Sequence, residues 1–281
     1  MNLGLAVSRA TLGGVADTAV LLDAAAALGV PARPIDWRAD GWGWADVVLL
    51  HTPWDYTDDP QAFTGWLAAL SERTRVWNPF ASIAGNMHKS YLLELADAGV
   101  PLPRTRLLRS GRPADLAELQ AAFADTEVVV KPAVGAGGRR LTRLPRVADL
   151  GAGQLLDPAG APVEDLVVQA FVPTIGQGEH SLVVIAGEPS HLVRKVPAAG
   201  EFRVQASYGG TESLVELDAT ATRVAELLRA RVADLAYARI DYVVDEDGEP
   251  LVMELELTEP DLFLRHCPDV ARALVEHVTR S

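Results

Sequence analysis

Residues 238–257 read ARIDYVVDEDGEPLVMELEL, and this stretch decides the fold. Apolar and polar residues alternate along residues 239–244 and again along residues 251–257, which is typical of two strands. Asp247-Gly248 lies between them and is a strong signal for a two-residue hairpin turn. The stretch is therefore predicted to form an antiparallel hairpin.

The register of this hairpin brings charged side chains together. Counting back from the turn sets Asp241 opposite Glu254 and Arg239 opposite Glu256. The period of two places all four side chains on one face. Like charges directly across a ladder repel each other, so this face is unusual for a simple strand pair. The opposite face is predicted to be core and carries four apolar side chains, Ile240, Tyr242, Met253 and Leu255.

Three carboxylates on one face, Asp241, Glu254 and Glu256, form a site of hard oxygen ligands. Mg²⁺ suits such a site because it usually takes one or two carboxylates together with phosphate oxygens and water. The alternative is a solvated acidic face on a surface hairpin. Val243 and Val252 interrupt the polar face and weigh against that alternative. The pattern favours a metal site.

A glycine-rich loop follows a predicted buried strand that ends at Lys131. Gly135, Gly137 and Gly138 can bring backbone N–H groups close to phosphate oxygens because glycine has no Cβ. The loop is not a Walker A motif, since no Gly-Lys-Ser/Thr closes it, and it lacks the third glycine of a dinucleotide fingerprint. Taken alone, the pattern is explained nearly as well by a flexible surface loop.

Lysine is rare in this chain. Of 25 basic residues only three are lysines, Lys89, Lys131 and Lys195, which leaves 22 arginines. Lysine is a compact and mobile point charge that suits phosphate groups. The three lysines are therefore candidates for phosphate contacts, and compositional drift is the alternative.

Residues 1 to about 80 differ in composition from the remainder, because all six tryptophans fall between Trp37 and Trp77. Their apolar pattern predicts a small parallel sheet with a helix, over residues 3–7, 15–28, 32–35 and 46–50. His51 and Asp55 lie just past the last of these strands, and ligands collect at the carboxyl ends of such strands. Packing of this aromatic segment against a neighbouring domain is the alternative.

The remaining chain alternates helices and strands without an internal repeat. Its helices are predicted over residues 88–98, 113–124, 219–236 and 269–280. Its strands are predicted over residues 105–108, 127–131, 165–169, 181–186 and 191–196. Residues 144–162 carry little signal.

Composition excludes several classes of function. The formal net charge of −13 opposes binding to nucleic acid. No apolar run is long enough to cross a bilayer, and the N-terminus does not have the pattern of a signal peptide. Cys267 is the only cysteine, so an internal disulfide and a cysteine-rich zinc site are excluded. A cytoplasmic protein without a membrane or nucleic-acid partner is predicted.

Together these motifs resemble the ATP-grasp superfamily of ligases, in its glutathione-synthetase-like form, from Lys89 to the last hairpin. The resemblance implies an α/β (α+β) ATP-grasp fold preceded by a Rossmann-like pre-ATP-grasp domain. The implied domains are residues 1–85, residues 86–170 with the glycine-rich lid loop, and residues 171–281 with the metal site. The implied cofactors are ATP and Mg²⁺, with two ions.

The resemblance also implies roles for single residues. For ATP these are Lys89, Lys131 at the phosphates, Gly135, Gly137 and Gly138 in the covering loop, Gln169, Ala170, Phe171 and Val172 at the adenine, and Glu179 at the ribose. Asp241 and Glu254 match the metal carboxylates, but Glu256 stands where the family commonly has asparagine, and it could pair with Arg239 instead. Arg203 matches the arginine that meets the γ-phosphate. Lys195 lies near the phosphates or the acyl group, or pairs with Glu179 or Glu201.

The implied reaction is phosphoryl transfer from ATP to a substrate carboxylate, followed by capture of the acyl phosphate by a nitrogen. The segments 54–56 and 253–264 resemble a group of small actinobacterial-type ligases, one of which closes O-ureido-serine to the isoxazolidinone ring of cycloserine. That resemblance makes O-ureido-D-serine the lead substrate and antibiotic biosynthesis the lead setting.

The substrate is then a small amino acid. Its predicted contacts are His51, Asp55, Arg203, Tyr208, Gly209 and Gly210, for each of which inter-domain packing is the alternative. Two other functions stay open, an intermolecular amino acid or peptide ligase and a non-catalytic ATP-binding regulator. By analogy with the family, a homodimer is expected.

Overall fold

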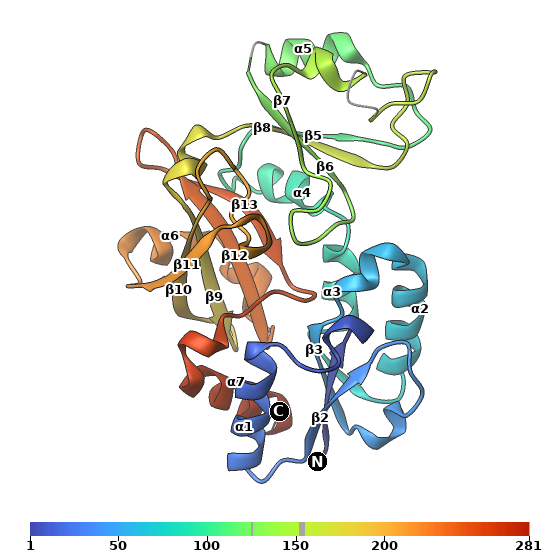
Figure 1. Ribbon diagram of the computed structural model, residues 1–281, viewed down its shortest axis with the longest axis vertical. Coiled ribbons are helices and arrows are strands. Elements are labelled where there is room, and N and C mark those ends of the chain that lie inside the picture. The colour runs from blue at the N-terminus through green and yellow to red at the C-terminus, as the bar shows by residue number, and fades with distance from the viewer. Residues whose placement is uncertain (125, 152–154, 281) are drawn as a thin grey trace.

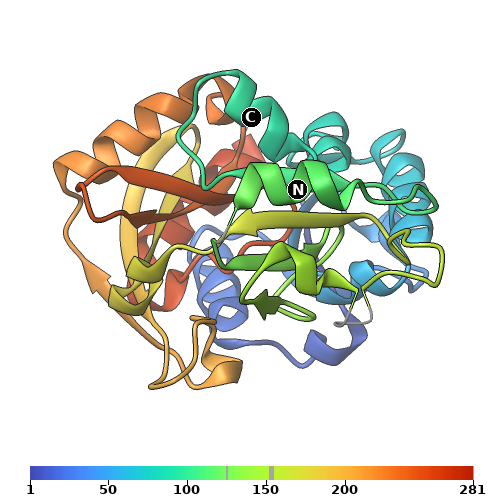
Figure 2. The same ribbon diagram turned by 90° about the horizontal axis from the view of Figure 1, so that it is seen from above.

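Three sheets organise the chain in the computed structural model, which describes residues 1–124, 126–151 and 155–280 (Figure 1). The N-terminal sheet is parallel, and the other two sheets are antiparallel. The second sheet forms the upper lobe in Figure 1, and the other two form the lower part of the molecule. Figure 2 shows the same arrangement from above.

The N-terminal sheet has the strand order β2-β1-β3-β4. β1 and β3 are buried along their whole length, as expected of parallel strands that are covered on both faces. Helix α1 ends just before Gly29, whose φ of +69° is the left-handed conformation that terminates many helices. The elements of this part are β1 (Leu3–Val7), α1 (Ala16–Ala27), β2 (Ala32–Asp36), β3 (Val47–Thr52), α2 (Pro60–Ser71) and β4 (Arg75–Trp77).

The upper lobe has a core of its own. Its sheet has the order β5-β8-β6-β7, and Phe123, Val128 and Leu166 belong to a buried cluster drawn from this lobe alone. Its elements are β5 (Thr105–Leu108), α5 (Leu116–Phe123), β6 (Val128–Pro132), β7 (Thr142–Leu144) and β8 (Leu166–Ala170). Helices α3 (Phe80–Asn86) and α4 (Tyr91–Asp97) connect the N-terminal sheet to this lobe.

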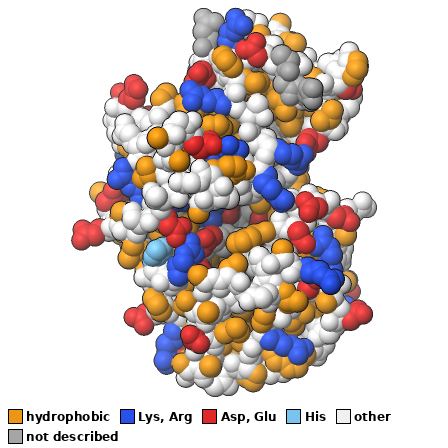
Figure 3. Space-filling view, viewed as in Figure 1, with side chains coloured by type: hydrophobic (Ala, Val, Ile, Leu, Met, Phe, Trp, Pro, Cys, Tyr) orange, Lys and Arg blue, Asp and Glu red, His pale blue; other side chains and the backbone are white. Residues whose placement is uncertain are grey.

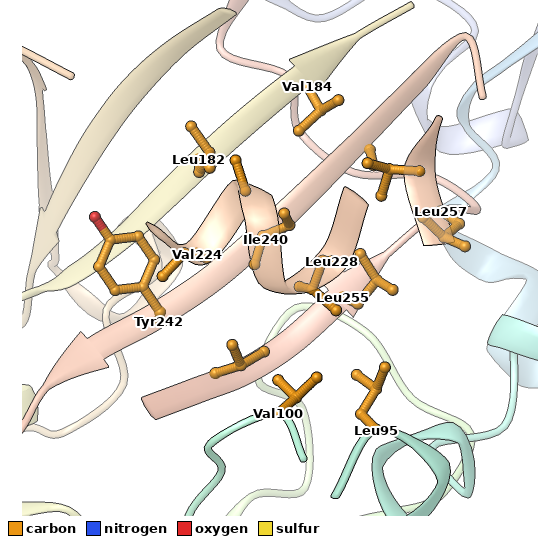
Figure 4. Close-up of a cluster of buried hydrophobic side chains, with 14 of the residues drawn as sticks. Leu95, Val100, Leu182, Val184, Val224, Leu228, Ile240, Tyr242, Leu255 and Leu257 are labelled. Carbon is orange, nitrogen blue, oxygen red and sulfur yellow. The ribbon is translucent and has the colours of Figure 1, made fainter. Parts of the chain in front are cut away.

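The third sheet, of order β11-β10-β9-β12-β13, is covered on both faces. On one face Leu182, Ile240 and Leu255 pack against α6 and α4 (Figure 4). On the other face Val183 and Tyr237 share a core with α7 and with α1 of the N-terminal part. The elements are β9 (Glu179–Ile185), β10 (Glu188–Val196), β11 (Thr211–Val215), α6 (Ala219–Val232), β12 (Tyr237–Val244), β13 (Pro250–Glu256) and α7 (Pro268–Arg280).

Asn78 is a second connection between the N-terminal part and the third sheet. Its side chain is fully buried, and its Nδ2 donates to the carbonyl oxygens of Tyr237 and Leu257, both at 2.9 Å. Its Oδ1 accepts a hydrogen bond from the Ala236 amide at 2.9 Å. One side chain therefore ties the segment that leaves the N-terminal sheet to one end of the β12–β13 pair.

The β12–β13 hairpin has the predicted pairs but not the predicted turn. Asp241 lies opposite Glu254 and Arg239 opposite Glu256, which confirms the expected register. The turn, however, has three residues between Asp245 and Glu249, and the Asp245 amide donates to the Glu249 carbonyl at 2.9 Å. A register shift between Asp241 and Tyr242 compensates for the extra turn residue. The extra turn residue and the bulge each shift the register by one residue in opposite directions, so Asp241 and Glu254 still face each other.

This bulge changes the position of one predicted core residue. Met253 lines the large pocket and packs against the small cluster of Val172, Ile175, Val204 and Val243 instead of the core of Ile240 and Leu255, because the shift in register turns its side chain to the other face. Val252 takes its place in the core, where it is fully buried beside Ile240 and Leu255. The prediction for Met253 is therefore wrong, while those for Ile240, Tyr242 and Leu255 are confirmed.

The other predicted helices and strands are present, with ends within four residues of those predicted. Five elements were not predicted, namely α2, α3, β4, β7 and β11. For α2 a signal existed, because Pro60 occupies its first turn and the Asp59 side chain accepts from the Ala62 amide at 3.0 Å. Within the low-signal residues 144–162, residues 152–154 lie outside the described part of the chain.

Short 3₁₀ helices complete the description, at η1 (Arg9–Thr11), η2 (Trp42–Trp44), η3 (Trp54–Asp58), η4 (Val147–Leu150), η5 (Pro173–Gln177), η6 (Ala206–Tyr208) and η7 (Leu264–His266). Among the residues that the structure describes, no helix combines the length and apolar character needed to span a bilayer.

Candidate active site

A pocket of about 760 Å³ opens where the upper lobe meets the two lower parts. Figure 3 shows a hollow in this region with basic and acidic side chains around it. Most of the residues predicted to bind ATP, metal or substrate line this pocket: Asp55, Lys89, Lys131, Gly135, Gly137, Gly138, Gln169, Ala170, Phe171, Val172, Glu179, Lys195, Arg203, Tyr208, Gly210, Asp241, Glu254 and Glu256. Residues distant in the sequence are thus gathered around one cavity.

Two predicted residues do not line this pocket. β3 continues through Thr52, so His51 is still part of the strand, and its Nε2 lies 2.8 Å from Thr18 Oγ1. His51 instead lines a smaller neighbouring cavity, and burial lowers its pKa to about 4. Gly209 ends η6 with a φ of +82° and shapes the loop behind Tyr208. The substrate contacts expected of these two residues therefore stay predictions.

The glycine loop after β6 is fixed from two sides. On one side the Tyr208 hydroxyl donates to the Gly138 carbonyl at 3.3 Å, and a Cβ on Gly138 would lie 2.7 Å from Gln205 Oε1. On the other side Arg139 Nη2 donates to Thr57 Oγ1 at 2.6 Å and to the Trp54 carbonyl at 3.2 Å. The loop therefore crosses the pocket and is held to both lower parts.

Lys89 joins this loop to the β12–β13 hairpin. Its Nζ donates to the Gly135 carbonyl at 2.6 Å and lies 2.7 Å from Glu254 Oε1. Burial alone would lower the pKa of Lys89, but the Glu254 carboxylate more than offsets this and raises it. Lys89 therefore remains charged at the base of the loop.

Lys131 differs from the other two lysines. It is the penultimate residue of β6, is only 8% exposed, and has no carboxylate within 4.0 Å among the described residues. Burial lowers the pKa of Lys131. A buried ammonium without a protein counter-charge is suited to an anionic ligand group.

Asp241 lies at the centre of a buried charge cluster. Arg239 donates to it through Nε at 3.0 Å and Nη2 at 2.8 Å, Ser181 bonds to it at 2.5 Å, and Lys195 Nζ lies 3.4 Å away. Burial would raise the pKa of Asp241, but Arg239 and Lys195 lower it well below its usual range. Lys195 also pairs with Glu179 at 2.5 Å, which is one of the two pairings anticipated for it.

Glu254 and Glu256 are the carboxylates that fit a metal ion best. Their side chains are 24% and 27% exposed and line the pocket, whereas Asp241 is 5% exposed and fully engaged. Glu256 also pairs with Arg239, which was the alternative anticipated for it. Burial raises the pKa of Glu256 to about 7.

No group of three His, Cys, Asp or Glu residues forms a metal cage within the described part of the chain. Two carboxylates fit an Mg²⁺ that takes its remaining ligands from phosphates and water.

Arg203 lies on the wall formed by β10 and η6. It pairs with Glu201 at 2.6 Å, and its guanidinium lies 3.7 Å from the centre of the Tyr208 ring. Hydrogen bonds from Arg203 and from backbone amides lower the pKa of Glu201 to about 2. Gly210 follows, where a Cβ would lie 2.0 Å from the Val204 carbonyl, so only glycine allows this loop to close behind Arg203.

Several residues of the pocket were not predicted. Arg239 was seen only as a partner for Glu256, although it also holds Asp241. Arg265 contacts Asp17 at 2.9 Å, Glu212 at 2.7 Å and Asp261 at 2.9 Å, and so connects three separate segments. Glu259 lines the pocket beside the N-terminal part. No local motif marks Arg265 or Glu259, because two of the three partners of Arg265 lie far away in the sequence and Glu259 has no ion-pair partner within the described residues.

Comparisons with known proteins agree with this geometry. Residues 102–259 match the family model of the prokaryotic glutathione synthetase ATP-grasp domain, and residues 3–78 match that of the N-terminal domain of D-cycloserine synthetase DcsG. The cycloserine biosynthesis protein DcsG of Streptomyces lavendulae is 29% identical, over 93% of this chain and 94% of that protein. The glutathione synthetase of Prochlorococcus marinus is 30% identical, over 79% and 77%.

Solved structures show the same relationship. The crystal structure of D-cycloserine synthetase DcsG superimposes with a TM-score of 0.86 and 26% identity, covering 100% of this chain and 99% of that one. The D-alanine–D-alanine ligase of Bacillus anthracis, complexed with ATP, gives a TM-score of 0.69 at 18% identity, covering 100% and 96%. The second likeness concerns the fold alone.

Proposed function

Because this chain belongs to the prokaryotic glutathione synthetase family of ATP-grasp proteins, and is an ATP-dependent ligase that forms C–N bonds, we propose that it closes O-ureido-D-serine to D-cycloserine. The observation that carries this choice of substrate is the match of residues 3–78 to the N-terminal domain of D-cycloserine synthetase. This part of the chain supplies Trp54 and Asp55 to the pocket. A setting in antibiotic biosynthesis follows from the same proposal.

The reaction balances as a ligation followed by one hydrolysis. The γ-phosphoryl group of ATP moves to the substrate carboxylate and ADP leaves. The nitrogen bonded to the side-chain oxygen attacks the acyl carbon, loses its proton, and displaces phosphate to close the ring. Cycloserine lacks the carbamoyl group, so one water molecule must release it as CO₂ and NH₃.

The described residues supply charge and orientation for these steps. We assign Lys131 and Lys89 to the phosphates of ATP, because Lys131 has no protein counter-charge and Lys89 supports the glycine loop. Arg203 and Lys195 are assigned to the γ-phosphoryl and acyl groups. Glu254 and Glu256 would hold Mg²⁺, which neutralises charge on phosphate oxygens when bound. Asp241 takes part by orienting Arg239 and Lys195, and it reaches a metal only if it releases them. Two Mg²⁺ ions are part of the proposal.

The other contacts to ATP follow the family pattern. Residues 169–172 at the end of β8 are assigned to the adenine, and Gly135, Gly137 and Gly138 to the covering loop. Glu179 is assigned to the ribose, although its pairing with Lys195 means that it must share its carboxylate. Asp55, Tyr208 and Gly210 are assigned to the substrate side. Domains of residues 1–85, 86–170 and 171–281, a cytoplasmic location and a homodimer remain predictions.

The test is the release of ADP from ATP and Mg²⁺ with O-ureido-D-serine, its L form and a panel of amino acids, with the product identified by mass spectrometry. We expect ADP and cycloserine to appear together with the D form only, and Lys131→Ala and Glu254→Gln to abolish both. ADP release that requires a second amino acid would identify an intermolecular ligase instead. Tight ATP binding with no turnover on any substrate would identify a regulatory protein.

A further inference from the structure

The charged side chains of the pocket are almost all paired with each other. Within the described residues, each carboxylate or basic group that lines the pocket lies within 4.0 Å of an opposite charge, with two exceptions. The exceptions are Lys131, a cation, and Glu259, an anion. Buried charges are normally paired, so an unpaired one at a binding site indicates a charged ligand group.

Glu259 satisfies this condition on the acidic side. It is 7% exposed, no described residue forms an ion pair with it, and its hydrogen-bonding neighbour is the neutral hydroxyl of Tyr56. Burial, followed by the charge of Glu256, raises its pKa to about 8, and the charges of Lys89 and Arg239 offset this only in part. The Tyr56 hydroxyl is neutral, because burial and then the charge of Glu259 raise the pKa of Tyr56 well above its usual value.

The two unpaired charges come from different parts of the chain, Lys131 from β6 of the upper lobe and Glu259 from the segment after β13. Lys131 is influenced by Glu254, Lys89, Glu179 and Asp241, the residues around the glycine loop and the buried charge cluster. Glu259 lies against the N-terminal part, where its backbone carbonyl accepts a hydrogen bond from Trp54 Nε1 at 3.2 Å. This hydrogen bond fixes an aromatic ring of the pocket beside Glu259. Lys131 therefore has no carboxylate within 4.0 Å and Glu259 no basic group within 4.0 Å among the described residues, although Lys89 and Glu254 influence the pKa of both.

We propose that Glu259 binds the primary ammonium group of an α-amino acid substrate. This inference rests on the proposed function, in which the substrate is an amino acid, and it names the residue that recognises it. An ammonium needs one carboxylate and suits a neighbouring aromatic ring, both of which are present here.

The test compares two ligands that differ only in the amine, O-ureido-D-serine and 3-(ureidooxy)propanoate. Their dissociation constants are measured by calorimetry with Mg²⁺ and the non-hydrolysable analogue AMPPNP, for the wild type and Glu259→Gln. Glutamine keeps the shape of the side chain and removes its charge. Glu246→Gln is the matched control, since Glu246 is exposed in the β12–β13 turn and its loss changes the net charge equally.

We expect the wild type to bind the amino compound about 10- to 100-fold more tightly than its des-amino analogue, as for a charge-assisted hydrogen bond. Glu259→Gln should bind both alike, and Glu246→Gln should behave as the wild type. The melting temperature of Glu259→Gln should not fall, because glutamine keeps the shape of the side chain and no ion pair is lost, and an unchanged value shows that the variant is folded.

Other outcomes would overturn the inference. Discrimination that survives in Glu259→Gln would exclude an ammonium contact at this residue. An equal fall of kcat for both ligands without a change in binding would assign Glu259 to proton transfer instead. A wild type that does not prefer the amino compound would also refute the inference. Discrimination in binding without ADP release from any substrate would refute the proposed function and support the ammonium site.

Discussion

Replacing Arg139 with alanine removes the side chain that holds the glycine loop to the N-terminal part. Its hydrogen bonds to Thr57 at 2.6 Å and to Trp54 at 3.2 Å are made to neutral acceptors, and each contributes about 0.5–1.5 kcal/mol. The 3.8 Å contact with Asp58 joins two exposed groups and adds almost nothing. Because Arg139 is itself half exposed, we take the lower part of the range, about 1.4 kcal/mol in total.

A loss of about 1.4 kcal/mol shifts the balance between closed and open loop roughly tenfold toward the open form. An open loop admits water to the acyl phosphate, so hydrolysis competes with ring closure. We therefore expect Arg139→Ala to release several ADP molecules for each cycloserine formed, whereas the wild type releases about one. The KM for ATP should change less than this ratio.

ADP and cycloserine are quantified in the same reaction by chromatography with mass spectrometry. Arg140→Ala is the control, because Arg140 is the next residue but pairs with Glu164 of the upper lobe at 2.5 Å and does not cross the pocket. Thr57→Val should raise the ratio of ADP to product in the same direction. An unchanged ratio in Arg139→Ala would refute the role of this contact in excluding water.

Three further predictions follow from single sites. Lys131→Ala should weaken ATP binding about 10- to 100-fold in calorimetry without lowering the melting temperature, because an unpaired buried charge is removed; lower thermal stability would contradict this. The pKa of His51 is about 4 in the folded state and 6.5 in the unfolded state. The unfolded state therefore binds more protons as the pH falls, and the free energy of unfolding should fall by about 2 kcal/mol between pH 7 and pH 5. Urea denaturation should show this loss reduced in His51→Gln, and an equal loss in both proteins would refute the assignment. Gly210→Ala places a Cβ 2.0 Å from the Val204 carbonyl and should abolish ADP release, whereas Gly65→Ala on the exposed face of α2 should not; normal turnover of Gly210→Ala would show that this loop is free to rearrange.

The ATP-grasp fold and the ligase class were predictable because their signals are local. The strand periods, the glycine loop and the acidic hairpin can each be read within about twenty residues, and the family match confirms what they predicted. The facing of Asp241 and Glu254 was predicted from a turn that the protein does not have. It was still obtained because the bulge beside Asp241 restores the register.

What the sequence did not reveal depends on distant partners. Arg265 matters because Asp17, Glu212 and Asp261 converge on it, and Glu259 because no basic side chain of the described residues lies within 4.0 Å of its carboxylate. His51 was placed wrongly with respect to the large pocket because β3 extends two residues further than predicted. The ion pairs of Glu256 with Arg239 and of Lys195 with Glu179 were predicted only as alternatives. The charges of these residues do not by themselves select one partner among several.

The shared core of α1, α7 and the third sheet, together with Asn78, has a mechanical consequence. The N-terminal part and the third sheet form one packed unit, and the upper lobe, with its separate core, forms a second. Asp55, Arg265 and Glu259 belong to the first unit, whereas Lys131 and the glycine loop belong to the second. The contacts proposed for the amino acid and those proposed for the covering loop of ATP are thus held by separate hydrophobic cores, so a core substitution in one unit can disturb one set of contacts and leave the other intact.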